Sequence, residues 1–239
     1  MSLADSFQPL YKQVYSLLTE RIVNGELKPS ESLPSEQALA AELGVSQGTV
    51  RKALNQMVAE NLLNRRQGKG TYVSEHTQES SLFRFFRFRE PGGESLVPQT
   101  KLISLERRAC NQHEQEQLNL SDSELVVQMN RVRSLEGQAV IVESIIQPLS
   151  VFPDIDLEPK IPNSLYTLYQ EKFSISIVEV REELRAVAMP AESAASLGLN
   201  AGDPVLCVER ASVNIDGRVV EWSQAFCKTE NFVYSVSLK

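Results

Sequence analysis

The chain has 239 residues, of which 42% are hydrophobic and 23% are charged, so it is long enough for two ordinary domains with buried cores. This composition excludes a disordered or collagen-like chain, and no run approaches the ~18 consecutive apolar residues that a membrane-spanning helix needs. The formal net charge of −7, with 31 acidic side chains against 24 basic ones, argues by itself against a nucleic-acid partner.

The charges are divided unevenly along the chain. Residues 1–75 carry eight basic and eight acidic side chains, whereas residues 76–239 carry sixteen basic and twenty-three acidic ones. Residues 74–81 are polar and lack apolar periodicity, which is typical of a linker. We therefore predict a first domain at residues 1–75, a linker and first segment of the second domain at 76–90, and the rest of that domain at 91–239.

Three helices are predicted in the first domain. An apolar stripe over residues 10–22 indicates the first helix. Ser35 is a suitable N-cap for a second helix, which stops at Gly44. Ser46 is a suitable N-cap for a third helix, which we expect Asn61 to close in a left-handed conformation.

A two-stranded hairpin is predicted after the third helix. Residues 62–65 and 71–73 have the composition of short strands, and the tip between them contains two glycines. Two helices joined by a short turn that contains glycine form a helix-turn-helix, and a hairpin in this position is a wing.

Positive charge gathers on the third helix and the wing, because residues 46–74 carry five basic side chains against Glu60 alone. Such a helix can enter a major groove, and its positive dipole end with Ser46 suits a phosphate. The side chains it presents to base edges are Gln47, Thr49 and Arg51. The wing cations that would meet phosphates or a minor groove are Arg65, Arg66 and Lys69. The alternative is a solvated charged face without a ligand.

Five short motifs form a distinctive series in residues 9–74. They are Pro9-Leu10-Tyr11, Leu33-Pro34-Ser35-Glu36, Leu43-Gly44-Val45-Ser46, Thr49-Val50-Arg51 with Ala53-Leu54, and Gly68 with Gly70-Thr71-Tyr72-Val73. Together they resemble the winged helix-turn-helix of the GntR superfamily of bacterial transcription regulators. Together with the excess of basic side chains over residues 46–74, the resemblance implies a set of DNA-contact residues. They are Ser35, Gln37, Ser46, Gln47, Thr49, Arg51, Lys52, Arg65, Gln67, Gly68 and Lys69.

The sequence departs from this family at two positions, since Gln37 and Gln47 stand where the family usually has arginine. Arginine pairs with guanine O6 and N7, whereas glutamine pairs with adenine N6 and N7, and each bidentate pair contributes ~1–3 kcal/mol of discrimination. We therefore expect an operator richer in A·T at those positions. We also expect a shallower dependence of affinity on salt than in an arginine-bearing relative.

No catalytic centre is predicted. Residues 44–48 fit the G-x-S-x-G pattern of a hydrolase nucleophile, but that elbow follows a strand, whereas a helix precedes it here. Residues 68–70 lack the third glycine of a dinucleotide-binding loop. The two histidines and three cysteines show no convergent spacing, so we expect packing or surface roles, no cofactor, no metal site and a reducing, cytoplasmic setting.

The second domain contains a weak internal repeat. Leu118-x-Leu120, Glu124, Val126 and Arg131 match Leu197-x-Leu199, Asp203, Val205 and Arg210 at the same offsets. Each copy combines a helical stretch, over 109–117 or 191–196, with an apolar hairpin. Two such units can pair their strands into one antiparallel sheet with helices packed outside, which makes the chain an α+β protein. The predicted strands are 100–105, 125–134, 139–148, 177–188, 204–214 and 219–228, with a helix at 164–172.

A second series of motifs lies in this domain. It comprises Arg131-x-Arg133, Glu136-Gly137, Glu143, Phe152-Pro153, Ser164-Leu165-Tyr166, the Leu-x-Leu repeats, and Asp216-Gly217 followed by Glu221-x-Ser223. In this order they resemble the UTRA effector-binding domain, a chorismate-lyase-like fold that follows the winged helix in the HutC subfamily. The resemblance implies Arg131 and Arg133 for an anionic group, Glu143 and Glu221 for hydroxyl, amide or amine groups, and Ser164 and Tyr166 as supplementary hydrogen-bonding groups.

Strand geometry bears on three of these pocket residues. Arg131 and Arg133 are two positions apart, so both point to one face of a strand, where two guanidinium groups suit a phosphate or carboxylate. The alternative is that they form salt bridges with the many carboxylates of the domain. A two-residue turn pairs position 131 with 142, which leaves Glu143 on the opposite face unless a bulge shifts the register.

Phenylalanines and arginines are interleaved over residues 83–89, a pattern that also occurs in proteins that stack single-stranded nucleic acids. We favour the first strand of the effector domain instead. In that interpretation the phenylalanines lie in the core or over the pocket mouth, and the arginines lie outside.

The sequence as a whole predicts a dimeric, repressor-type transcription regulator that is not an enzyme. Two heads on a two-fold axis imply a pseudo-palindromic operator in double-stranded DNA, and a phosphate- or carboxylate-bearing effector must prefer one arrangement of the heads. We expect it in the bacterial cytoplasm, at the nucleoid when bound to its operator and not at a membrane. The rival interpretations are a constitutive DNA binder without a ligand and a chorismate-lyase-like enzyme.

Overall fold

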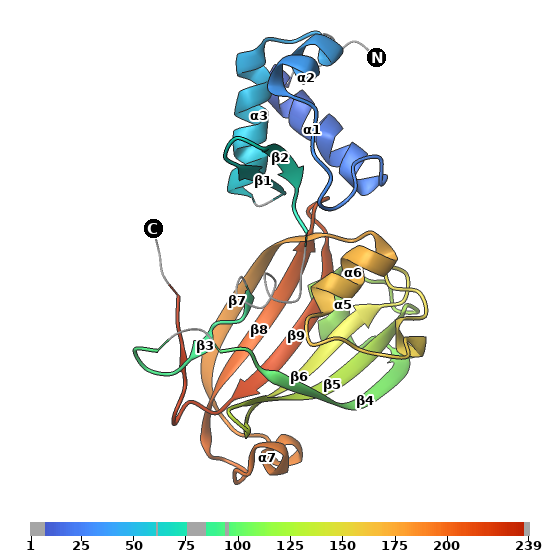
Figure 1. The fold of residues 1–239 in the computed structure, drawn as a ribbon. Helices are drawn as coiled ribbons and strands as arrows, with labels where there is room; N and C mark the ends of the chain where they lie inside the picture. Colours follow the sequence, from blue (N-terminus) through green and yellow to red (C-terminus); the bar gives the residue numbers. More distant parts are fainter. Residues whose placement is uncertain (1–7, 61, 76–84, 94–95, 237–239) are drawn as a thin grey trace. The chain divides into compact units, whose positions relative to one another are not determined.

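The computed structural model describes residues 8–60, 62–75, 85–93 and 96–236. The chain divides into two compact units, Met1–Glu75 and His76–Lys239, each with buried hydrophobic residues of its own (Figure 1). None of the described helices is long and apolar enough to cross a bilayer.

The first unit is a three-helix domain with a hairpin. Its elements are α1 (Leu10–Val23), α2 (Glu36–Leu43), α3 (Gln47–Ala59), β1 (Leu63–Arg66) and β2 (Gly70–Val73), the two strands pairing antiparallel. Both predicted N-caps are present, since the hydroxyl of Ser35 accepts from the N–H of Ala38 and that of Ser46 from the N–H of Thr49. Gly44 ends α2 with φ +66°, which few other residues adopt. The predicted winged helix-turn-helix is confirmed.

Helix α3 ends next to the position where the sequence predicts its closing residue, Asn61. The helix ends at Ala59, and the next residue, Glu60, has φ −87° and is therefore not left-handed. Its N–H bonds back to the carbonyl of Gln56, and the N–H of Leu62 bonds to a carbonyl of the last turn. Asn61, to which the prediction gave the closing role, lies outside the described residues.

The second unit is built on one six-stranded antiparallel sheet with the order β4-β5-β6-β9-β8-β7. Its strands are β4 (Gln99–Ala109), β5 (Leu125–Leu135), β6 (Gln138–Pro148), β7 (Ile177–Ala188), β8 (Pro204–Asn214) and β9 (Val219–Cys227). Strands β5 and β6 form the hairpin of one repeat, β8 and β9 form that of the other, and β6 pairs with β9 where the repeats meet, while β4 and β7 are the edge strands. The predicted joining of two units into a single sheet is confirmed.

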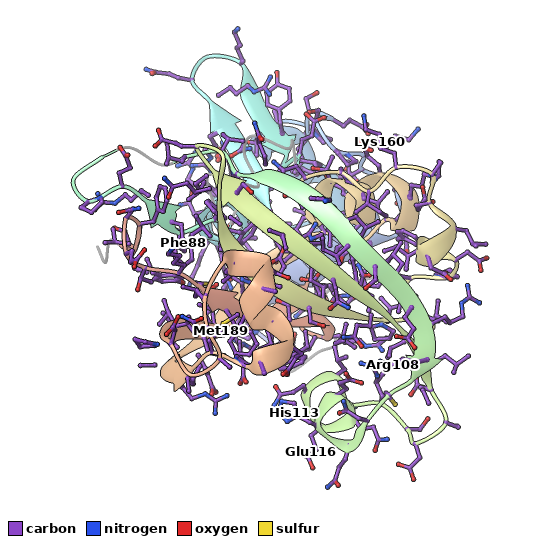
Figure 2. The ribbon with its side chains drawn as sticks, turned by 90° about the horizontal axis from the view of Figure 1, so that it is seen from below. Phe88, Arg108, His113, Glu116, Lys160 and Met189 are labelled. Carbon is purple, nitrogen blue, oxygen red and sulfur yellow. The ribbon has the colours of Figure 1, made fainter. Side chains whose placement is uncertain are left out.

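Helices cover both faces of this sheet. They are α5 (Gln112–Leu118), α6 (Leu165–Phe173), α7 (Ala191–Leu197) and the 3₁₀ turn η2 (Ile155–Leu157). Helix α6 packs on the face that contains Val127. Helices α5 and α7 pack on the opposite face, to which the neighbouring strand residue Val126 belongs. Figure 2 shows α5, which carries His113 and Glu116, apart from α7. The sheet thus has one face covered by α6 and an opposite face covered by α5 and α7.

One element boundary differs clearly from the prediction. Strand β4 continues to Ala109, where the prediction placed the start of a helix. Helix α5 begins only at Gln112, because Asn111 and Glu114 form a capping box there. Apart from the strand expected over residues 83–89, the other strands and helices predicted in this domain lie within one residue of their expected bounds.

The segment before β3 (Phe88–Arg89) is not the strand that its alternation suggested. Strand β3 has two residues and pairs with β10 (Val233–Tyr234), outside the main sheet. Phe85 and Phe86 are buried, as predicted for the phenylalanines. A regular strand would turn these neighbours to opposite sides, whereas both line the cavity described below. Residues 83 and 84 lie outside the described residues.

Candidate functional sites

The predicted DNA-contact residues lie on the surface of the first unit, on and next to α2, α3 and the wing. All of them are exposed except Thr49, which is half-buried and whose hydroxyl lies 2.8 Å from that of Ser46. At the wing tip, Gly68 has φ +71°, so its conformation favours glycine. The structure thus places the eleven residues on accessible surface within one compact unit.

Several of these cations already contact protein groups. The Nζ of Lys52 lies 4.0 Å from the centre of the Tyr11 ring. The carboxylate of Glu36 lies 2.8 Å from the Nε of Arg51 and 3.1 Å from an Nη of Arg65. Exposed contacts of these kinds each contribute at most about 1 kcal/mol, so they order the side chains without preventing exchange for phosphates.

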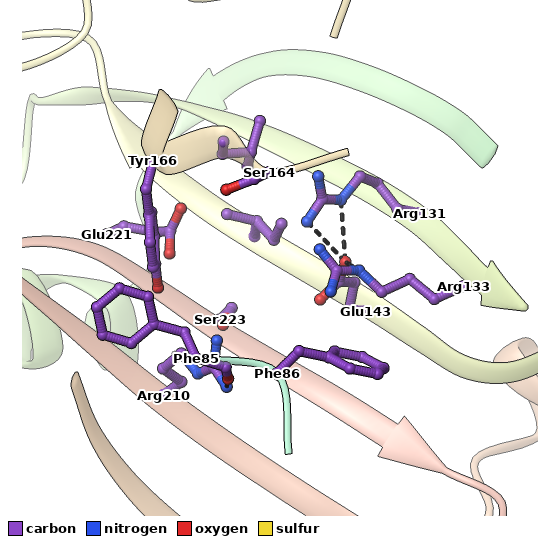
Figure 3. Close-up of a pocket in the computed structure, with 12 residues that line it drawn as sticks. Phe85, Phe86, Arg131, Arg133, Glu143, Ser164, Tyr166, Arg210, Glu221 and Ser223 are labelled. Atoms are coloured by element: carbon purple, nitrogen blue, oxygen red, sulfur yellow. Dashed lines mark hydrogen bonds and ion pairs between the residues drawn. The ribbon is translucent and has the colours of Figure 1, made fainter. Parts of the chain in front are cut away.

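A cavity lies on the α6 face of the sheet in the second unit (Figure 3). Its lining includes all six predicted effector residues, Arg131, Arg133, Glu143, Ser164, Tyr166 and Glu221, together with Phe85, Phe86, Ile145, Leu165, Arg210 and Ser223. These residues come from β5, β6, β8, β9, the start of α6 and the segment before β3. The fold therefore joins groups that lie far apart in the sequence.

A bulge brings Glu143 to this cavity. The pairing of β5 with β6 shifts after Arg133, so that Val140 is the extra residue and Arg131 lies opposite Glu143 rather than position 142. Such a bulge is the condition under which Glu143 shares a face with the arginines, and the condition is met.

Glu143 is the centre of a buried ion cluster. Its Oε1 lies 2.7 Å from an Nη of Arg131 and 2.8 Å from the Nε of Arg133, although the latter contact is not aligned as a hydrogen bond. Burial raises the pKa of Glu143, but the two guanidinium charges outweigh burial and lower that pKa to about 2. The salt bridges that the sequence analysis weighed as an alternative are therefore present, but inside the cavity rather than on the surface.

Two donors of this cluster lack a hydrogen-bond partner in the described part of the chain, the Nε of Arg133, which contacts Glu143 only as an ion pair, and the Nη1 of Arg131. The Nη1 of Arg131 has no hydrogen-bond partner among the described residues, and only 3% of Arg131 is exposed. A buried guanidinium group normally has its donors satisfied, because an unpaired one costs free energy. The cluster thus has fewer hydrogen-bond acceptors than donors.

Glu221 lies in a hydrogen-bonded network that also lines the cavity. It accepts hydrogen bonds from the hydroxyls of Tyr169 and Ser212, and the Ser212 hydroxyl lies 2.8 Å from that of Tyr166. Burial raises the pKa of Glu221, and the hydrogen bonds from Tyr169 and Ser212 only partly offset this effect. Burial therefore disfavours the charged form of Glu221, while the network of hydroxyls stabilises that form in part.

Arg210 is a cavity residue that the sequence analysis did not assign to the pocket. One of its Nη atoms donates to the carbonyl of Phe85 at 2.7 Å, and its Nε donates to Glu182 at 2.8 Å. The repeat contained a signal for it, because Arg210 has the same offset in the second copy as Arg131 in the first. Its cross-strand partner Ser223 was named in a motif but given no role.

The N-terminus of α6 meets the same cavity. The N-cap residue, Ser164, makes no side-chain hydrogen bond to the first turn, and both Ser164 and Leu165 line the cavity. The preceding residue, Asn163, accepts a hydrogen bond from an Nη of Arg133 through its carbonyl at 3.1 Å. N–H groups at a helix N-terminus and a nearby guanidinium group together suit an anion.

Comparisons with known proteins agree with the two-part arrangement. Residues 10–73 match bacterial regulatory proteins of the gntR family, and residues 93–233 match the UTRA domain. The mannosyl-D-glycerate transport/metabolism system repressor MngR of Escherichia coli is 30% identical over 96% of this chain and 95% of its own. The transcriptional repressor NagR of Bacillus subtilis is 29% identical over 95% and 93%. The structure of PhnF from Mycobacterium smegmatis, at 19% identity, shares the fold over 95% of this chain and 99% of its own, with a TM-score of 0.57.

Proposed function

This chain belongs to the gntR family of bacterial regulatory proteins and carries a UTRA domain, and on that premise we propose that it is a transcriptional repressor controlled by a small anionic effector. The winged helix-turn-helix binds a pseudo-palindromic operator through the exposed residues of α2, α3 and the wing. The effector binds in the cavity next to α6 and changes the affinity for the operator.

The unused donor of Arg131 carries the proposal for an anionic effector. Three arginines line the cavity, of which Arg131 is the most buried, and the carboxylates that contact them are Glu143 and Glu182. The three guanidinium charges exceed the two contacting carboxylate charges, and burial, which raises the pKa of Glu221, disfavours a further negative charge there, so a phosphate or carboxylate would neutralise the excess. The relative MngR is named for mannosyl-D-glycerate, which bears a carboxylate.

The remaining parts of the proposal concern assembly and location. A homodimer would place two heads on a two-fold axis and read two half-sites of one operator. Such a regulator acts in the bacterial cytoplasm, on the nucleoid when bound, and without turnover of its effector. The constitutive DNA binder and the chorismate-lyase-like enzyme remain the alternatives, and the following screen separates them.

A thermal-shift screen of sugar phosphates, carboxylates and phosphonates tests the effector site. We expect at least one compound to raise the melting temperature of the wild-type chain and not that of Arg133→Ala. Arg181→Ala is the matched control, because Arg181 is an exposed arginine of the same unit whose partner is Glu179.

The absence of any stabilising compound in this screen would favour the constitutive binder. Stabilisation that survives Arg133→Ala would reject this cavity, and turnover of a stabilising compound by the wild-type chain would favour the enzyme.

Replacement of Gln47 tests the DNA interface. We expect Gln47→Arg to move the preference at the contacted base pair from A·T towards G·C by ~1–3 kcal/mol, because arginine matches guanine O6 and N7. The measurement is parallel selection of operators from random duplexes by the wild type and the variant. Recovery of guanine by the wild type, with no change in the variant, would contradict the assigned role of Gln47.

A further inference from the structure

Glu36 contacts three of the proposed DNA-contact residues at once. Its Oε2 lies 2.8 Å from the Nε of Arg51, and its Oε1 lies 3.1 Å from an Nη of Arg65. The Nε2 of Gln47 also approaches Oε2, at 3.5 Å. Gln47 and Arg51 belong to the recognition helix α3, whereas Arg65 belongs to the wing. A single carboxylate on α2 therefore ties together the two elements that are proposed to read DNA.

The sequence and the fold hold this carboxylate in place. Glu36 is the first residue of α2, directly after the N-cap Ser35, where the positive end of the helix dipole favours an anion. Its side chain is 22% exposed, whereas those of Arg51 and Arg65 are 56% and 41% exposed. The Glu36 side chain is thus more buried than its two partners, whose guanidinium groups remain accessible to a ligand.

We propose that Glu36 is a positioning residue of operator recognition, which orders Arg51 and Arg65 before DNA arrives. The inference rests on the proposed function, because it takes these arginines as DNA contacts. A long side chain that is already ordered loses less conformational freedom on binding, so a specific complex gains affinity. The same negative charge repels phosphates and weakens sequence-independent binding. The ordering raises the ratio of specific to non-specific affinity, whereas the repulsion acts on both complexes and leaves that ratio unchanged.

Glu36→Gln separates these effects. It removes the charge at nearly constant size, so we expect non-specific affinity to rise and the ratio of specific to non-specific affinity to fall about tenfold. Glu42→Gln is the matched control, since it removes the same charge from the same helix but its partner is Arg21 on α1. That control should leave the ratio unchanged. Affinities are measured by titration of the operator duplex obtained from the selection and of a scrambled duplex, at two salt concentrations.

Equal rises in both affinities for Glu36→Gln would overturn the proposal, because the carboxylate would then act only as a repelling charge. A second variant, Glu36→Asp, keeps the charge and the helix N-terminus but shortens the side chain by one methylene group. We expect it to lower the ratio while leaving non-specific affinity unchanged, and an unchanged ratio would also overturn the proposal. Failure of the wild-type chain to select any operator would instead reject the proposed function itself.

Discussion

Glu143→Gln will lower the free energy of unfolding at pH 7 by about 3 kcal/mol. The variant removes the carboxylate that faces Arg131 and Arg133 and leaves two buried guanidinium groups without a counter-ion. A pKa lowered from the ordinary 4.5 to about 2 corresponds to a contribution of similar size. Urea unfolding of both proteins measures the difference. Glu179→Gln is the control, because it removes a carboxylate from an exposed ion pair with Arg181 and should change stability little.

The pH dependence of this loss has a defined sign. Because folding lowers the pKa of Glu143, its contribution is fully present above about pH 4.5 and is lost as the pH falls towards 2. The difference between the wild type and Glu143→Gln should therefore shrink by more than half between pH 7 and pH 3. A difference that stays constant over this range would mean that the destabilisation arises from altered packing and not from the lost charge.

Phosphate should protect the Glu143→Gln protein more strongly than the wild type. The two guanidinium groups that lose their carboxylate become a better anion site, and a ligand that binds only the folded state stabilises it in proportion to the logarithm of its concentration. Melting temperatures measured over a series of inorganic phosphate concentrations give the comparison. Equal protection of both proteins would indicate that phosphate binds elsewhere.

The features that sequence predicted best depend on residues close together in the chain. Ser35 and Ser46 each cap a helix through an N–H three residues away, so their role follows from local sequence. The two repeats share the same spacing of matching residues, so the sequence alone predicts that their strands form one sheet. Arg131 and Arg133 share a face for the same reason, since alternation along a strand needs no knowledge of its neighbours.

The bulge that places Glu143 could not be predicted, because it depends on packing between distant segments. Val140 and Ile141 are neighbours, yet both are buried in one cluster with Phe86 and Phe232. A regular strand turns adjacent residues to opposite faces, so the extra residue is what allows both to enter the same core. Whether that core accepts both side chains is decided by residues more than fifty positions away.

The place of Arg210 in the cavity could not be predicted from sequence for a related reason. Its sequence offset matched that of Arg131, but its role depends on Glu182 of the neighbouring strand and on the carbonyl of Phe85, 125 residues away. The backbone before β3 is irregular, and periodicity describes only regular elements. The repeat could therefore indicate a strand position for Arg210, while its contacts required the folded chain.

Arg133→Ala should remove the response of operator binding to the effector while leaving operator binding itself nearly unchanged. Arg133 contacts Glu143, the carbonyl of Asn163 and the ring of Phe86, all within the second unit. The proposed DNA contacts belong to the first unit, so the affinity without effector should stay within about threefold of the wild type. In the wild type, a coupling free energy of ~1–3 kcal/mol predicts a 5- to 150-fold change in operator affinity when the effector binds. In Arg133→Ala this change should disappear.

The measurement is operator affinity with and without a saturating amount of the stabilising compound from the screen, for the wild type, Arg133→Ala and Arg181→Ala. Coupling between two binding sites is reciprocal, so in the wild type the operator must change the effector affinity by the same factor as the effector changes the operator affinity. Arg133→Ala should lower effector affinity whether or not the operator is present. If it instead kept normal effector affinity and lost only the response, the effector would bind outside this cavity, and Arg133 would act in transmitting the signal.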